Sequence, residues 1–206
     1  MKTILFLGDS ITDCNHSFDP DNLGYGYVRL ISEKISDDAR CINKGIDGFT
    51  MPALRRLWKT QCLSLSPDMI TILIGINDLA VMKNTGMDFA RGIEHFTENY
   101  RELLEEIRLI TDCPIILMEP FIFPYPAEYA LWEPELHEMC EAISQLAMQN
   151  HTRFLPLWDT LASAAKLHGY GKITTDGIHL TKLGHEIVAE KLLETLLIHD
   201  FFNFTL

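Results

Sequence analysis

Positive charge is scarce in this sequence. The chain of 206 residues contains 17 Lys and Arg against 29 Asp and Glu, so its formal net charge is -12. Nucleic acids and anionic membrane surfaces bind proteins through clustered Lys and Arg, and this balance therefore argues against both as partners. The composition favours a small, uncharged ligand.

Long apolar runs and paired cysteines are also missing. No stretch is long enough to span a bilayer, and no charged segment followed by an apolar run and a cleavage site of small residues precedes the first apolar stretch. The cysteines are odd in number and include no C-x-x-C pair: they are Cys14, Cys41, Cys62, Cys113 and Cys140. This pattern suits reduced thiols better than disulfides or a zinc site. We therefore expect a cytoplasmic protein.

Internal repeats, low-complexity tracts and linkers are absent as well. Hydrophobic residues make up 47% of the chain, which is enough to bury one substantial core at this length. We expect residues 1–206 to form a single domain.

Short apolar segments alternate with amphipathic ones along the chain. The clearest buried strand is MITILIG at residues 69–75, which is β-branched and apolar. Further strands are predicted at residues 3–7, 39–42, 114–118 and 153–155. Helices are predicted at residues 25–35, 87–110, 135–150 and 182–197, with others beginning near Pro52 and Trp158.

This alternation predicts a parallel sheet with helices on both faces, because parallel neighbours need crossover connections. We expect a flavodoxin-like, three-layer α/β/α sandwich whose five-stranded parallel sheet has the order 2-1-3-4-5. Sheets of this type bind ligands beyond the carboxyl ends of their strands. The loops at that edge are therefore where chemistry is expected.

Four loops at that edge carry reactive groups. The first strand ends in GDSITDC, the second in NKGIDGFT and the third in GINDLA, while TTDGIHL precedes the last helix. Together these loops supply a hydroxyl, a glycine, a carboxamide, a carboxylate and an imidazole, from Ser10, Gly48, Asn77, Asp176 and His179. This is the set of groups that acyl transfer requires.

Chemistry assigns a role to each group. A serine hydroxyl is a poor nucleophile until a base removes its proton, and His179 suits Ser10 because imidazole titrates near neutral pH. Asp176 precedes His179 by three residues, so its carboxylate is expected to hold the other ring nitrogen. The N–H groups of Ser10 and Gly48 and the amide of Asn77 are expected to form the oxyanion hole.

Taken one at a time, these residues have simpler interpretations. Asp9 and Ser10 are typical helix N-caps, while Gly48 and Asn77 suit turns. Their convergence on one sheet edge favours the catalytic interpretation. Asp9 and Asp78 are interpreted as carboxylates that tie down the loops, with solvated turn residues as the alternative.

The four blocks resemble those of the SGNH, or GDSL, hydrolase family. GDSIT, the glycine of NKGIDGFT, GIND and DGIHL occur in the family's order across about the whole chain. The resemblance implies Ser10 as nucleophile, His179 as base, Asp176 as its partner, and Gly48 and Asn77 as oxyanion donors.

Two points within this resemblance stay open. Gly45 competes with Gly48 for the second block, although the family pattern places the donor in the later glycine. The importance of Asp176 is also open, because the family tolerates a missing third member of the triad.

The resemblance implies a serine ester hydrolase, or acylhydrolase. The detailed sequence of the blocks is similar to that of the branch of acetylxylan and other carbohydrate acetylesterases. We therefore expect the substrates to be short acyl esters, such as O-acetyl groups on a carbohydrate or other small molecule. Lysophospholipases and thioesterases share the same blocks and remain the alternative. Aromatic residues of the loop after the fourth strand are expected either to wall the pocket or to pack that loop: Phe121, Phe123, Tyr125, Tyr129 and Trp132.

Two other functions would use the same loops. A phosphate or flavin site after the first strand is disfavoured, because Asp9 and Asp13 would repel an anion. A metal-dependent hydrolase would use Asp9, Asp13, Asp176 and His179, but their spacing matches no ligand pair on a helix. We expect no metal and no cofactor.

The last six residues are strongly apolar. Residues 201–206 read FFNFTL. Packing onto the parent domain and a subunit contact in a homo-oligomer both explain such an end.

Overall fold

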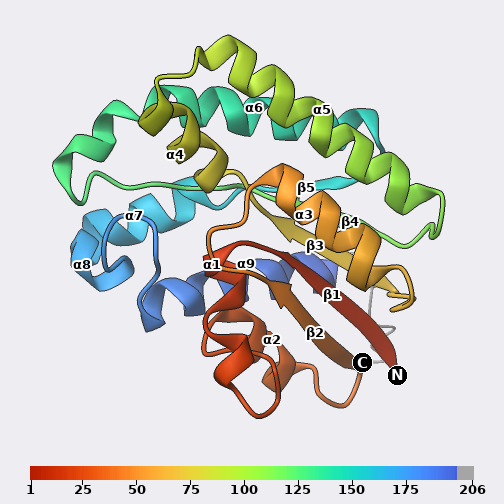
Figure 1. Cartoon of the computed structure of the whole chain (residues 1–206). Helices are drawn as coiled ribbons and strands as arrows, with labels where there is room; N and C mark the ends of the chain where they lie inside the picture. Colours follow the sequence, from red (N-terminus) through yellow and green to blue (C-terminus); the bar gives the residue numbers. More distant parts are fainter. Residues whose placement is uncertain (199–206) are drawn as a thin grey trace.

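The computed structural model describes residues 1–198 and contains one five-stranded sheet (Figure 1). Its strands are β1 (Lys2–Gly8), β2 (Ala39–Gly45), β3 (Met69–Leu73), β4 (Ile115–Met118) and β5 (Arg153–Leu155). The order is β2-β1-β3-β4-β5 and every neighbouring pair is parallel. The predicted fold class and strand order are confirmed.

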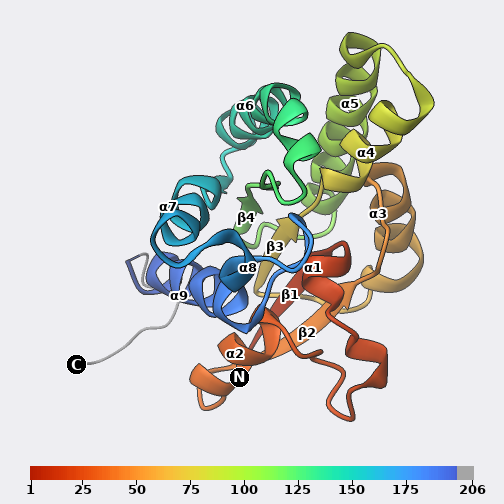
Figure 2. The same cartoon turned by 90° about the vertical axis from the view of Figure 1, so that its left-hand side faces the viewer.

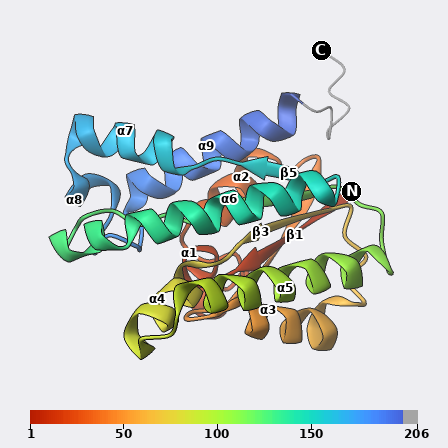
Figure 3. The ribbon, with the colours of Figure 1, turned by 90° about the horizontal axis from the view of Figure 1, so that it is seen from above.

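Helices cover both faces of the sheet, which gives the three layers. One face packs against α2 (Tyr27–Lys34), α7 (Trp158–His168) and α9 (Lys182–Ile198). The other packs against α3 (Met51–Leu57), α4 (Ile76–Thr85), α5 (Phe89–Arg108) and α6 (Glu133–Gln149). Figures 2 and 3 show α7 and α9 on the side of the sheet opposite to α3 and α5.

Short helices and turns lie between these elements. They are α1 (Ser10–Asp13), α8 (Tyr170–Ile173), the 3-10 turns η1 (His16–Phe18) and η3 (Ala127–Leu131), and the π-helical turn η2 (Trp58–Cys62).

The central strands are apolar because both of their faces are buried. In β1, Ile4 and Phe6 join the core beneath α2 and α9, whereas Leu5 and Leu7 join the core beneath α3 and α5. Successive side chains of a strand point to opposite faces, so a strand that is covered twice needs apolar residues at every position.

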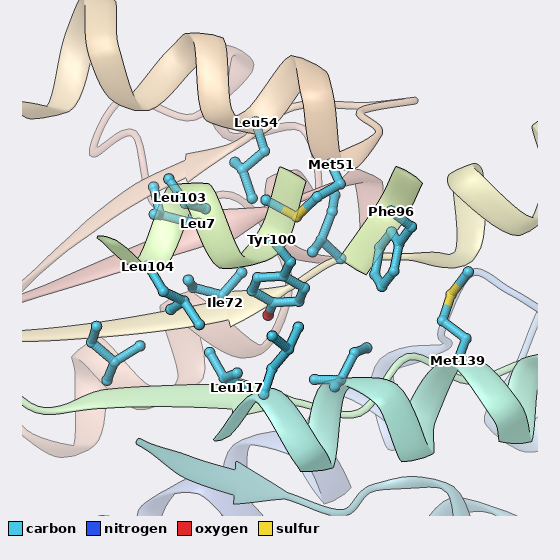
Figure 4. Close-up of a cluster of buried hydrophobic side chains, with 14 of the residues drawn as sticks. Leu7, Met51, Leu54, Ile72, Phe96, Tyr100, Leu103, Leu104, Leu117 and Met139 are labelled. Atoms are coloured by element: carbon cyan, nitrogen blue, oxygen red, sulfur yellow. The ribbon is translucent and has the colours of Figure 1, made fainter. Parts of the chain in front are cut away.

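The core under α3 and α5 includes Met51, the first residue of α3, which directly follows the NKGIDGFT loop. Figure 4 shows side chains from three strands packed against three helices: Leu7, Ile72 and Leu117 against Met51, Leu54, Phe96, Tyr100, Leu103, Leu104 and Met139. Burial of one such side chain contributes roughly 1.5–3 kcal/mol. This cluster therefore anchors the start of α3, directly after the NKGIDGFT loop.

The structure differs from the predicted elements at three places. β2 runs on to Gly45, three residues beyond its predicted end. Helix α4 begins within the GINDLA segment and α8 within the segment before the last helix, where loops were expected. Polar residues at these positions suit turns as well as helix starts, so local sequence does not distinguish the two.

Two expectations concern membranes and the C-terminal segment. No helix within residues 1–198 is long and apolar enough to cross a membrane. The apolar residues 201–206 lie outside the described residues.

Two buried carboxylates hold the loops that follow β1 and β3. Asp9 caps α1 and accepts the N–H of Ile11 at 3.0 Å. Asp78, near the start of α4, accepts the N–H of Met51 on both oxygens at 3.0 Å and so joins α4 to α3. Their exposed fractions are 1% and 7%. Burial raises the pKa of both carboxyls from 3.8 to about 7, because the ionised form loses its hydration.

We predict that the free energy of unfolding falls as the pH rises from about 4 to about 7. Over this range the folded protein retains protons on Asp9 and Asp78 that the unfolded chain, with carboxyl pKa values near 3.8, has released. His185 acts in the opposite direction, because burial lowers its pKa from 6.5 to about 4, but this single group offsets only one of the two carboxyls. Each group changes the free energy of unfolding by at most about 1.4 kcal/mol per pH unit. Urea unfolding at a series of pH values measures this fall.

The variant Asp78→Asn should show a smaller fall, because one of the two groups no longer titrates. Asp37→Asn, which removes an exposed carboxyl from the loop before β2, is the matched control and should keep the wild-type dependence. Identical pH dependence in the wild type and Asp78→Asn would contradict this account.

Candidate active site

Ser10, His179 and Asp176 come together at the carboxyl edge of the sheet. Ser10 opens α1 directly after β1, and the other two lie in the loop between α8 and α9. Ser10 Oγ is 3.0 Å from His179 Nε2, and His179 Nδ1 is 2.6 Å from Asp176 Oδ2. The structure thus brings the three predicted side chains into one chain of hydrogen bonds.

The loop around Asp176 fixes the imidazole. Asp176 Oδ1 accepts the N–H groups of Ile178 at 3.0 Å and His179 at 2.8 Å, which leaves Oδ2 to the ring. Burial raises the pKa of Asp176, but hydrogen bonds from His179 and Ile178 outweigh this effect and hold the pKa below 3.8. The ionised Asp176 accepts a hydrogen bond from the Nδ1–H of His179. Nε2 is then unprotonated and faces Ser10 as the proton acceptor.

Gly48 lies in a tight turn at residues 46–49. The Phe49 N–H donates to the Ile46 carbonyl at 3.2 Å, and Gly48 has a φ of +71° while Asp47 does not adopt positive φ. This is a type II turn, which favours glycine at its third position. A Cβ on Gly48 would meet no atom within 4 Å, and no hydrogen bond within residues 1–198 uses its N–H. The donor is therefore free for a ligand.

Gly45, the competing glycine of the same loop, differs in each respect. It is buried at the end of β2, and its N–H donates to Asn43 Oδ1 at 2.9 Å. Its N–H is thus already engaged, and the geometry favours Gly48 as the donor.

Asn77 and Ser10 also offer unused donors. Asn77 Nδ2 donates to the Phe49 carbonyl at 3.0 Å, which orients the amide and leaves its second N–H unused by any other part of the described chain. Ser10 is the first residue of α1, so its N–H has no acceptor within the helix. It has no other partner in the described part of the chain.

A cavity of about 340 Å³ opens beside Ser10 and His179. The rest of its lining combines apolar and polar side chains: Ile11, Asp13, Cys14, Asn15, Asp47, Leu180 and His185. This mixed lining differs from a long apolar groove.

The aromatic loop after β4 does not wall this cavity, contrary to one of the two expectations. Phe121 and Phe123 are buried in the core beneath α7 and α9. Tyr129 and Trp132 pack on each other with ring centroids 5.0 Å apart. These four aromatic residues pack within the core or the loop instead, whereas Tyr125 is 45% exposed.

His185 and Cys14 line the cavity although sequence reasoning missed both for this site. The Tyr27 N–H donates to His185 Nδ1 at 3.2 Å, so the ring carries its proton on Nε2, which lies 3.6 Å from Cys14 Sγ. Burial and then the charge of His179 lower the pKa of His185 to about 4. A neutral ring whose accepting nitrogen is occupied does not serve as a second base. Its position within α9 offers no sequence signal.

Metal ligation was the other use considered for the acidic residues here. Across residues 1–198, no group of three or more His, Cys, Asp or Glu side chains is placed to hold a metal ion. Asp9 instead caps α1, and Asp176 orients His179.

Known proteins resemble this chain over nearly its full length. An acetylxylan esterase of Geobacillus stearothermophilus is 26% identical over 208 residues, which cover 95% of this chain and 94% of that protein. The crystal structure of a protein classed as a GDSL-like lipase from Parabacteroides merdae matches with a TM-score of 0.86 at 28% identity, over 94% of both chains. A crystal structure of the Geobacillus esterase matches at 0.81 and 26%, over 94% of this chain and 93% of that one.

Three solved structures of the Geobacillus esterase are described as catalytic mutants, in which a serine, an aspartate or a histidine is replaced by alanine. The aspartate and histidine lie three positions apart there, as Asp176 and His179 do here. The model of the GDSL-like Lipase/Acylhydrolase family matches residues 6–187. The chain belongs to this family and is a carboxylic ester hydrolase.

Proposed function

We propose that this esterase removes short acyl groups, above all O-acetyl groups from a carbohydrate or other small molecule, with Ser10 as its nucleophile. The observation that carries the proposal is the relay from Ser10 through His179 to Asp176, with hydrogen bonds of 3.0 and 2.6 Å, at the mouth of a cavity. The unused donors of Ser10, Gly48 and Asn77 support it.

Acylation begins when Ser10 Oγ attacks the carbonyl carbon of the ester. The hydroxyl proton moves to His179 Nε2, and ionised Asp176 stabilises the imidazolium through the Nδ1–H. The carbonyl oxygen becomes an oxyanion that accepts hydrogen bonds from the Ser10 and Gly48 N–H groups and the Asn77 amide. The bond to the alcohol oxygen then breaks, and that oxygen takes the proton from His179.

Deacylation repeats these steps with water. His179 takes a proton from the water as its oxygen attacks the acyl carbon, and the same donors hold the second oxyanion. When this intermediate collapses, the acid leaves and the proton returns from His179 to Ser10 Oγ. The proton that leaves with the alcohol is replaced by one from water, so Ser10 and His179 end the cycle in their starting states.

The cavity favours small, uncharged esters. Its volume of about 340 Å³ lies at the low end for small-molecule sites, which span roughly 300–1,000 Å³. The carboxylates of Asp13 and Asp47 in its wall would lose hydration against a long alkyl chain and would repel an anionic ester. The resemblance to an acetylxylan esterase supports acetylated sugars among the small uncharged esters.

We predict that Asn77→Ala lowers kcat by roughly a hundred-fold or more and changes KM little, because an oxyanion donor acts mainly in the transition state. Steady-state hydrolysis of nitrophenyl acetate measures both constants. Asn99→Ala is the matched control, since Asn99 is partly exposed on α5 and, within residues 1–198, its side-chain amide bonds only to His95. An effect on KM alone would instead place Asn77 in substrate binding.

We also predict that kcat/KM falls from acetyl to dodecanoyl across a series of nitrophenyl esters, because the cavity is small and its lining includes the carboxylates of Asp13 and Asp47. A panel of acetylated xylo-oligosaccharides, a lysophospholipid and an acyl thioester then compares leaving groups, with Ser10→Ala as the background for each substrate. A steady rise toward long chains would support the lysophospholipase or thioesterase alternative and contradict the acetylesterase proposal.

A further inference from the structure

We propose that Asp13 is a positioning residue for the oxyanion hole. Its carboxylate holds the turn at residues 46–49 against α1, so that the Gly48 N–H is presented to a carbonyl oxygen bound at Ser10. This role rests on the proposed function, in which Gly48 is an oxyanion donor.

The carboxylate of Asp13 bridges the nucleophile's helix and the donor's turn. Asp13 ends α1, and its Oδ2 accepts the N–H of Asp47 at 3.1 Å. Its Oδ1 accepts the His16 N–H at 3.1 Å and lies 2.6 Å from His16 Nδ1. Both oxygens are engaged by protein donors, which favours a structural tie over a direct bond to substrate.

Contacts with β2 hold the backbone of Asp13 in place, which limits the movement of its carboxylate. A Cβ on Gly45 would lie 2.2 Å from the Asp13 nitrogen, which shows how closely the end of β2 packs on α1. Asn43 Nδ2 adds hydrogen bonds to the carbonyls of Thr12 at 2.7 Å and Asp13 at 3.4 Å. A shift of α1 relative to β2 would break these contacts.

The turn is held on its other side by the loop after β3. Asn77 donates to the Phe49 carbonyl at 3.0 Å, and Asp78 accepts the Met51 N–H at 3.0 Å. These two ties lie after Gly48 in the sequence, whereas the Asp13 bond to Asp47 lies directly before it. Asp13 therefore completes the support of the turn on the side of the nucleophile.

The tie at Asp47 acts on the peptide directly before the one that carries the Gly48 N–H. In this type II turn the central peptide joins Asp47 to Gly48 and supplies the Gly48 N–H, whereas Asp13 holds the N–H of the preceding peptide. The tie therefore fixes the position of the turn relative to α1. A misplacement of the Gly48 N–H by about 1 Å can already cost a hundred-fold in rate.

A matched set of variants separates this tie from the effect of negative charge. Asp13→Ala removes the tie and the charge, while Asp13→Asn removes the charge and keeps one oxygen that can accept the Asp47 N–H. Asp47→Asn removes a carboxylate from the same cavity but leaves the backbone N–H that Asp13 holds. The readouts are kcat and KM for nitrophenyl acetate, and the affinity for a boronic acid that forms a tetrahedral adduct on serine.

We expect Asp13→Ala to lower kcat roughly ten- to a hundred-fold with KM nearly unchanged, and the boronic acid to bind weaker by a similar factor. Asp13→Asn should recover part of kcat, and Asp47→Asn should lose far less than Asp13→Ala. If Asp13→Ala does not fold, Asp13→Asn must still have a lower kcat than Asp47→Asn.

Three results would overturn the positioning role: a wild-type kcat in Asp13→Ala, a change in KM alone, or equal losses in all three variants, which would indicate a charge effect. Ser10→Ala separates this failure from that of the proposed function. Full activity in Ser10→Ala would reject the proposed function itself. An inactive Ser10→Ala beside a fully active Asp13→Ala would reject only the role of Asp13.

Discussion

The hydrogen bond between Ser10 Oγ and His179 Nε2 joins side chains 169 positions apart in the sequence, at a distance of 3.0 Å. It forms because the parallel sheet directs the loop after β1 to the same edge as the loop before α9. One hydrogen bond contributes only about 1 kcal/mol, so each loop must be held by contacts of its own. The chemistry proposed here therefore depends on how firmly each loop is fixed, and the bonds of Asp9, Asp78 and Asp176 to backbone N–H groups serve that purpose.

One device recurs at this edge of the sheet: a carboxylate that accepts backbone N–H groups from a loop. Asp9 after β1, Asp78 after β3 and Glu119 after β4 all do so, with Glu119 Oε2 accepting the N–H groups of Leu157 and Trp158 at 2.7 and 2.8 Å. Burial raises the pKa of Asp9 and Asp78 to about 7, so these ties cost stability at neutral pH. Sites that need fixed geometry commonly trade stability for it.

The sheet order could be predicted because buried strands and amphipathic helices have distinct periods, as β3 and α5 illustrate. The relay could be predicted because each of its groups lies beside a strand end or a glycine turn. Helix α4 was missed, since Asn77 and Asp78 at its start suit a turn equally well. The burial of Phe121 and the contact between Asp13 and Asp47 depend on segments distant in sequence, and no local pattern records them.

The most direct test of the account is to map the residue that a fluorophosphonate modifies while esterase activity is followed in the same sample. We predict that Ser10 alone is modified, in proportion to the activity lost, because among the serines of residues 1–198 its hydroxyl is the one that bonds to a histidine beside unused oxyanion donors. Labelling of another serine in step with the loss of activity, or full activity in protein labelled at Ser10, would contradict it.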